Sequence, residues 1–144
     1  MKKDVTDKKP LIFIVDDDED DRYFIKSAIL NNISHSDIEL FKNGKELIDH
    51  LQKTKNTLPS FILLDLNMPV LNGKETLKLI RKNETMVNLP VIIFSTSNRT
   101  CEKSLCFEYG ATDYFCKPAC VEDYNNIARK LNLEYIKKDS VGMA

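Results

Sequence analysis

Short apolar segments alternate with longer segments of helical periodicity along the whole chain. The apolar segments lie at 11–15, 38–41, 61–64, 90–94 and 113–116. Unbroken apolar runs of this length are typical of strands that are buried on both faces of a parallel sheet. Each run is followed by a segment in which apolar residues recur every three or four positions. This β-α alternation predicts a single parallel sheet with helices on both of its faces.

Turn and cap residues predict where the helices begin and end. Helices are expected after Asn43-Gly44, at Asn72-Gly73, at 95–98 with its Ser-Thr-Ser-Asn sequence, and over 121–136, and Gly110 should end the fourth helix. The first helix should begin near Asp20, with the preceding acids complementing its dipole. The apolar face of that first helix is predicted to contain Tyr23, Phe24, Ser27, Ala28, Leu30 and Asn31.

Polar residues of a particular kind follow four of the predicted strands. Asp16 and Asp17 follow the first strand, Asp65 the third, Ser95 the fourth and Lys117 the fifth. The carboxyl ends of parallel strands meet at one edge of a sheet, and ligands bind in the crevice outside that edge. We therefore expect these five side chains to lie together, although they are far apart in the sequence.

The chemistry of this set points to a divalent cation and a phosphoryl group. Three carboxylates in one crevice raise one another's pKa unless a cation lies among them. Oxygen ligands with room for water suit Mg²⁺. A lysine and a hydroxyl group beside the metal suit phosphoryl oxygens. The arrangement predicts a carboxylate that accepts phosphate.

Composition narrows the class of protein further. The chain has 144 residues, a formal net charge of -1 and 42% hydrophobic residues, which is typical of one globular domain. Because there is no basic excess, nucleic acid is not an expected partner. Apolar runs of strand length do not predict a membrane span, and the N-terminus does not fit a signal peptide, so a cytoplasmic location is expected. The four cysteines have no CxxC spacing and are predicted to be reduced thiols.

Four blocks of the chain resemble the receiver domain of two-component response regulators. They are Val-Asp-Asp-Asp at 15–18, Leu-Asp-Leu-Asn-Met-Pro at 64–69 with Asn72-Gly73, the segment 90–96, and Tyr-Phe-Cys-Lys-Pro at 114–118. The resemblance implies a flavodoxin-like (βα)5 fold with strand order 2-1-3-4-5, and a receiver domain over 10–137 between a flexible N-terminus, 1–9, and a flexible C-terminal tail, 138–144.

The resemblance also implies a role for each residue of the site. Asp65 is the expected phospho-acceptor, and Lys117 would contact the phosphoryl oxygens. Asp17, Asp65 and the backbone carbonyl of Asn67 would bind Mg²⁺ directly, with Asp16 acting through water. Ser95 fills the switch-hydroxyl position, Tyr114 the aromatic switch position, and Asn67, Thr96 and Ser97 are positions that modulate phosphate lifetime. The Lys117–Pro118 peptide is expected to be cis.

A receiver of this kind implies a set of partners. A sensor histidine kinase or hybrid kinase would donate the phosphoryl group, and signalling would proceed through protein contacts or onward transfer to a phosphotransfer protein. The resemblance allows a homodimer through the face of the fourth helix, fifth strand and fifth helix. The small regulators that accompany bacterial phytochromes are the most similar subgroup. Such a chain is a switch, with self-dephosphorylation allowed, rather than an enzyme that turns over a substrate.

Two other hypotheses fit parts of the pattern. A Mg²⁺-dependent phosphatase of the haloacid dehalogenase type would use an Asp-x-Asp motif, here Asp16 and Asp18, and would turn over a phosphomonoester. A pseudo-receiver would bind partners without binding Mg²⁺. Asp18 rather than Asp65 would be essential in the first case.

Overall fold

A five-stranded parallel sheet forms the centre of the protein, which we describe from a computed structural model covering residues 9–54 and 57–137. The strand order is β2-β1-β3-β4-β5, as predicted, and every neighbouring pair is parallel. The strands are β1 (Leu11–Val15), β2 (Asp37–Phe41), β3 (Phe61–Leu64), β4 (Val91–Ser95) and β5 (Asp113–Cys116). Apart from Lys9, the two segments predicted to be flexible, 1–9 and 138–144, lie outside the described residues.

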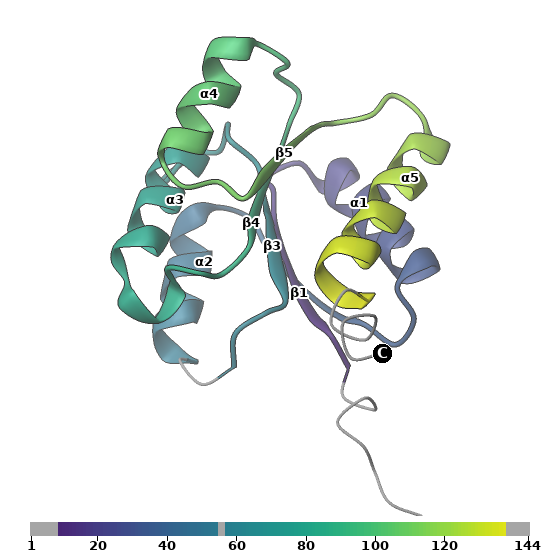
Figure 1. Ribbon diagram of the computed structural model, residues 1–144, viewed down its shortest axis with the longest axis horizontal. Helices are drawn as coiled ribbons and strands as arrows, with labels where there is room; N and C mark the ends of the chain where they lie inside the picture. Colours follow the sequence, from purple (N-terminus) through teal and green to yellow (C-terminus); the bar gives the residue numbers. More distant parts are fainter. Residues whose placement is uncertain (1–8, 55–56, 138–144) are drawn as a thin grey trace, which may run out of the picture.

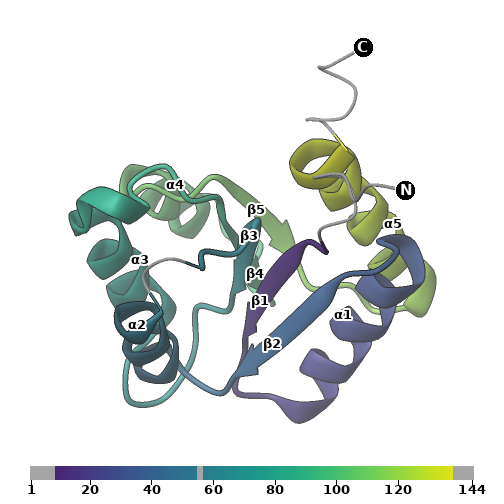
Figure 2. The same ribbon diagram turned by 90° about the horizontal axis from the view of Figure 1, so that it is seen from below.

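Helices cover both faces of the sheet. Two of them, α1 (Glu19–Asn32) and α5 (Val121–Leu131), pack on one face, and α2 (Gly44–Lys53), α3 (Gly73–Lys82) and α4 (Thr100–Glu108) pack on the other (Figures 1 and 2). A 3-10 turn, Glu84–Met86, follows α3, and a π-helical turn, Asn132–Ile136, extends α5. The doubly wound α/β fold predicted from the sequence is confirmed.

Alternate residues of the central strands belong to two separate hydrophobic clusters. Phe13, Val15, Ile62 and Leu64 point toward α2, α3 and α4. The residues between them point toward α1 and α5. Because β1, β3 and β4 are buried on both faces, their sequences are unbroken apolar runs, and this is why the strands were predictable to within a residue.

The buried face of α1 differs from the predicted one. The structure buries Ile25, Ala28 and Ile29, whereas Tyr23 and Leu30 are 65% and 48% exposed. Apolar residues occur nearly all around this helix, so their spacing does not define a single face. Five of the six positions that were predicted to form the core face, all except Leu30, line an open groove between α1 and α5, and Ala28 is the one of them that is also buried.

Two Asn-Gly pairs mark the starts of α2 and α3. Asn43 and Asn72 cap α2 and α3, and Asn72 forms a reciprocal capping box with Glu75. Gly73 packs directly against the chain that follows β3, because a Cβ atom at this position would lie 2.2 Å from the carbonyl oxygen of Asp65 and 2.7 Å from the Cα of Leu66. Glycine at 73 therefore sets the distance between α3 and the segment that carries Asp65.

Replacing Gly73 with alanine should destabilise the protein, since the added methyl group would overlap backbone atoms that cannot rotate away. We expect the free energy of unfolding to fall by about 3 kcal/mol, at the upper end of overpacking effects. Urea denaturation measures the change, with Lys82→Ala at the exposed end of the same helix as the control. If Gly73→Ala lowers the free energy of unfolding no more than Lys82→Ala does, the loop after β3 can shift to accommodate the added methyl group.

Arg81 ties together the segments at the far end of α3. Its guanidinium donates to the carbonyl oxygens of Gly110 at 2.8 Å and Met86 at 3.1 Å. Gly110 follows α4 and has a φ of 104°, a left-handed conformation that favours glycine. The C-terminal end of α4 is thus fixed to α3. None of the helices in the described part of the chain is both long and apolar enough to cross a membrane.

Candidate functional site

Three carboxylates converge at the edge of the sheet where the parallel strands end. Asp16 and Asp17 follow β1, and Asp65 follows β3; each offers an oxygen within 4.8 Å of the others. We call these three residues the carboxylate cluster. Asp16 and Asp65 are buried, with 2% and 5% exposure, whereas Asp17 is exposed to solvent. The predicted convergence of these acids is present in the structure.

Lys117, which follows β5, extends into the same site. Its Nζ lies 2.7 Å from Oδ2 of Asp16 and 3.6 Å from Oδ1 of Asp65. The lysine side chain is only 7% exposed. It also contacts Asp21 of α1 at 2.8 Å, a contact that was not predicted from the sequence. One ammonium group therefore lies within 3.6 Å of three carboxylates, those of Asp16, Asp21 and Asp65, and does not neutralise all of their negative charge.

That excess of charge and the burial of the site shift its pKa values. Burial, and then the charge of Asp16, raise the pKa of Asp65 to about 7, against the opposing effect of Lys117. Burial also raises the pKa of Asp16 despite its hydrogen bond from Lys117. For Lys117, burial acts to lower the pKa, but hydrogen bonds to Asp16 and Asp21 and the charge of Asp65 raise it above its usual range. Two adjacent acids with raised pKa values are a common feature of functional sites.

The donor set of the cluster fits a hard divalent cation. One oxygen from each of the three carboxylates lies within 4.8 Å of the others, which is close enough for the three residues to hold one ion, directly or through a bound water. The exposed position of Asp17 leaves room for the waters that Mg²⁺ retains. Asp16, Asp17 and Asp65 are thus able to hold such an ion.

Ser95 is the last residue of β4 and is fully buried at the same edge of the sheet. Its Oγ accepts a hydrogen bond from the backbone N–H of Ser97 at 3.2 Å. The prediction that 95–98 starts a helix was wrong, because α4 begins at Thr100 and Arg99 is its N-cap residue. Serine hydroxyls bond equally well to local backbone groups outside helices, and Ser95 and Ser97 do so here.

Tyr114 lies next to this loop and points inward. It is 6% exposed, and its hydroxyl donates to the carbonyl oxygen of Ser97 at 2.7 Å. Burial raises the pKa of the Tyr114 phenol. Thr96 is exposed, between the buried Ser95 and the half-buried Ser97. The hydrogen bond from Tyr114 to Ser97 therefore links the aromatic side chain to the loop after β4.

The loops around Asp65 and Lys117 differ from expectation in one respect. No peptide bond in the described residues is cis, so the prediction of a cis Lys117–Pro118 bond is wrong for this structure. The cis and trans forms before proline differ by only about 1 kcal/mol, so sequence alone does not select between them. Asn67 is exposed after β3, and beyond it Val70 has a φ of 70° within a tight turn closed by Leu71 N–H to the Pro69 carbonyl.

Asp18, which the phosphatase hypothesis requires as a catalytic acid, has a structural role. It is the N-cap of α1, and its Oδ1 accepts the backbone N–H of Asp21 at 3.0 Å. The guanidinium of the nearby Arg22 donates to the carbonyl oxygen of Asp16 at 2.7 Å. Asp21 lies four residues after Asp17, in the first turn of α1. This spacing is the sequence feature that could have indicated that Asp21 reaches the site.

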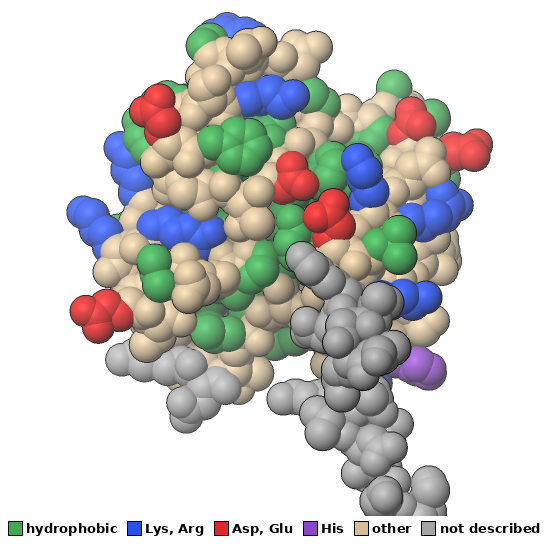
Figure 3. Space-filling model, viewed as in Figure 1, with side chains coloured by type: hydrophobic (Ala, Val, Ile, Leu, Met, Phe, Trp, Pro, Cys, Tyr) green, Lys and Arg blue, Asp and Glu red, His purple; other side chains and the backbone are tan. Residues whose placement is uncertain are grey.

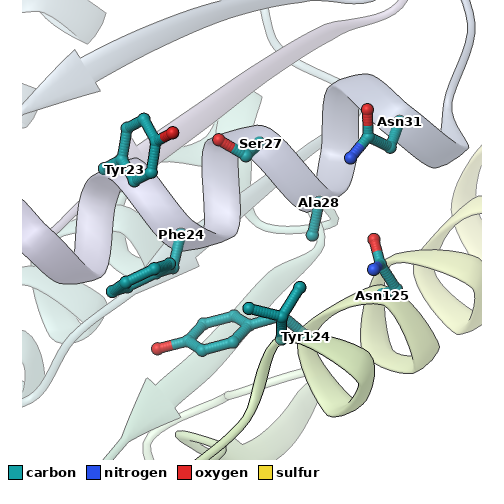
Figure 4. Close-up of a pocket in the computed structure, with 8 residues that line it drawn as sticks. Tyr23, Phe24, Ser27, Ala28, Asn31, Tyr124 and Asn125 are labelled. Carbon is teal, nitrogen blue, oxygen red and sulfur yellow. The ribbon is translucent and has the colours of Figure 1, made fainter.

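An open groove runs along the surface where α1 and α5 pack together. Figure 4 shows Phe24 and Ala28 on the side of α1 that faces Tyr124 of α5. With Tyr23, Ser27, Asn31 and residues of α5 they line a hollow of about 200 Å³. The rings of Phe24 and Tyr124 are 5.7 Å apart.

The face shown in Figure 3 carries both acidic and basic side chains, interspersed with small hydrophobic patches. This face therefore has no electrostatic potential of one predominant sign.

The chain matches the response regulator receiver domain family over residues 12–129. It is 30% identical over 122 residues to a two-component response regulator of Oryza sativa subsp. japonica, with 85% of this chain and 88% of that one covered. It is 36% identical over 113 residues to a protein-glutamate methylesterase/protein-glutamine glutaminase of Bacillus licheniformis, with 75% of this chain covered but only 29% of the relative. The chain spans less than half of several of the curated relatives that it matches.

Solved structures share the fold. The phosphorylated cyanobacterial phytochrome response regulator RcpA superposes with a TM-score of 0.84 at 24% identity, covering 91% of this chain and 96% of that one. The Mn²⁺-bound form of response regulator Rcp1 superposes with a TM-score of 0.79 at 21% identity, covering 89% and 95%. The family match, the strand order and the relatives agree with one another and do not support the phosphatase alternative. This chain therefore belongs to the response regulator receiver domain family of two-component systems.

Proposed function

We propose that this protein is a phosphorylation switch in which Asp65 accepts a phosphoryl group from a histidine kinase. The observation that carries the proposal is the placement of the Lys117 ammonium within reach of both Asp16 and Asp65, beside carboxylates that suit a divalent cation. Membership of the receiver family supports the same function. Phosphorylation by a histidine kinase is the general property of receiver domains.

The proposed transfer is an in-line displacement at phosphorus. A carboxylate oxygen of Asp65 forms a new P–O bond while the P–N bond of the donor phosphohistidine breaks. The departing imidazole nitrogen keeps the electron pair and takes up a proton, and the product is an aspartyl phosphate. Asp65 must be ionised to attack, and because burial and the charge of Asp16 raise its pKa to about 7, positive charge such as that of Lys117 is needed beside it to favour the ionised form.

Each neighbouring residue has a proposed part in this reaction. Asp16, Asp17 and Asp65, with the Asn67 carbonyl, would hold Mg²⁺, which when bound neutralises charge on the phosphoryl oxygens. Lys117 would donate to a phosphoryl oxygen. Ser95 would turn toward the phosphate, and Tyr114 would change its packing against the loop after β4. Asn67, Thr96 and Ser97 would set how readily water reaches the aspartyl phosphate, and thus the rate of self-dephosphorylation.

The output of the switch is proposed to be a change in protein contacts. The inward ring of Tyr114 lies between β5 and the loop that leads to α4, so a movement of Ser95 would reach the surface formed by α4, β5 and α5. That surface would bind a target protein or a second copy of the chain. Onward transfer to a phosphotransfer protein is the other proposed route, and a cytoplasmic location is part of the same proposal.

Acetyl phosphate tests the reaction without the kinase. With Mg²⁺ present, intact-mass spectrometry should show one phosphoryl group per chain, and chelation of the metal should reduce labelling by more than tenfold because the charge of the cluster is then not offset. The same sample should not turn over p-nitrophenyl phosphate. Steady hydrolysis of that monoester, or labelling that is unchanged by chelation, would contradict the proposal.

A further inference from the structure

Lys117 is held by a carboxylate that does not belong to the carboxylate cluster. Oδ2 of Asp21, on the first turn of α1, accepts a hydrogen bond from Lys117 Nζ at 2.8 Å. Its side chain is 27% exposed, compared with 3% for Asp16 and 7% for Lys117. The ammonium group therefore lies between the buried carboxylate of Asp16 and the partly exposed carboxylate of Asp21 on α1.

The first turn of α1 holds Asp21 firmly in this position. The backbone N–H of Asp21 donates to the cap residue Asp18 at 3.0 Å. The guanidinium of the next residue, Arg22, donates to the carbonyl oxygen of Asp16 at 2.7 Å. These two contacts fix the start of the helix to the end of β1, so the Asp21 carboxylate approaches Lys117 from a rigid element.

The geometry gives the two carboxylates different tasks. An ammonium group has three hydrogens, and Lys117 directs two of them at Asp16 and Asp21, while Asp65 at 3.6 Å is beyond hydrogen-bond distance. A divalent cation in the cluster would compete for the oxygens of Asp16 and would repel the ammonium. Asp21 lies outside the cluster and would keep its contact with Lys117.

We infer that Asp21 is a positioning residue that anchors the Lys117 ammonium in the site when the carboxylate cluster binds a divalent cation. Lys117 then keeps one hydrogen free for an oxygen on the incoming phosphoryl group. Without this anchor the lysine side chain, whose four-carbon stem rotates freely, would turn toward solvent to escape the metal. The inference rests on the proposed role of Lys117 in contacting the phosphoryl group.

The test compares phosphorylation rates at saturating Mg²⁺ and a fixed concentration of acetyl phosphate. Asp21→Asn removes the charge with little change of shape and should slow labelling by roughly tenfold, a part of the loss seen when a stabilising donor is removed altogether. Asp20→Asn makes the same charge change on the neighbouring, exposed residue and should leave the rate within about twofold of the wild-type value. Urea denaturation verifies that both variants are folded.

A double variant separates anchoring from any other effect of Asp21. If Asp21 acts through Lys117, then Asp21→Asn should not slow labelling further in a Lys117→Met background, followed long enough to quantify its slow rate. An equal slowing with and without Lys117, a rate for Asp21→Asn that matches or exceeds wild type, or a matching loss in Asp20→Asn would overturn the inference. If wild-type protein itself takes up no phosphate, the proposed function fails rather than this inference alone.

Discussion

Asp65→Asn is expected to abolish phosphorylation of the chain by acetyl phosphate or by a partner kinase. The amide that replaces the carboxylate is a poor nucleophile and cannot form the acyl phosphate, so labelling should fall by at least about a hundredfold. The substitution preserves shape, and the hydrogen bond from the Leu66 N–H to Oδ1 can be kept. Mass spectrometry of the intact protein, followed by mapping of any remaining label, measures the effect.

Asp18→Asn provides the matched control for that experiment. Asparagine caps helices as well as aspartate does, so the start of α1 should be preserved and labelling should stay near the wild-type level. The phosphatase hypothesis makes the opposite prediction, since it requires Asp18 and not Asp65. Persistent labelling of Asp65→Asn would remove Asp65 from its proposed role.

The stability of the metal-free protein should fall as the pH rises toward neutrality. The pKa of Asp65 is about 7 in the folded protein and 3.8 in its ordinary state, so the folded state binds a proton more tightly. A group of this kind contributes stability that is fully present below about pH 4 and is lost as the pH rises through about 7. The contribution of Asp65 is at most about 4 kcal/mol, from the value of one pKa unit.

Urea denaturation from pH 4 to pH 8, with chelator present, measures this dependence. Asp65→Asn removes the titration, so the difference in unfolding free energy between the variant and the wild type should grow in favour of the variant as the pH rises. Comparing the two proteins cancels the titration of unrelated groups such as Glu102, whose pKa is lowered by its hydrogen bond with Ser97. Adding Mg²⁺ at pH 8 should reverse the order of stability. If the difference in unfolding free energy does not change with pH, the pKa of Asp65 is not raised in the folded protein.

The sequence predicted most of what local pattern determines. Strands buried on both faces have no polar positions, so their ends are marked by the first charged or turn residue, as at Val15 and Leu64. Parallel topology then brings Asp16, Asp65 and Lys117 together, because strand ends of one direction share an edge. The fold and the principal residues of the site were therefore predictable without coordinates.

Other features depend on contacts that local pattern does not encode. The buried face of α1 follows from packing against β1 and α5, and its apolar residues are spread too evenly around the helix for their spacing to indicate which face is buried. The start of α4 at Thr100 reflects competition between a helix and local hydrogen bonds of Ser95 and Ser97. The contact between Asp21 and Lys117 joins residues 96 positions apart, and only the folded chain shows that the lysine stem reaches α1.

The two ends of α4 are held to α3 by contacts of different strength: Arg81 binds the chain at the C-terminal end, and a partly exposed ion pair lies near the N-terminal end. At the C-terminal end the Arg81 guanidinium grips the Gly110 carbonyl, whereas near the N-terminal end a partly exposed pair, Lys74 with Glu102 at 3.2 Å, is the corresponding tie to α3. We therefore expect α4 to be displaced more readily at its N-terminal end, beside Ser97 and Tyr114, than at Gly110, so that a change in the loop after β4 would tilt the helix about its anchored C-terminal end.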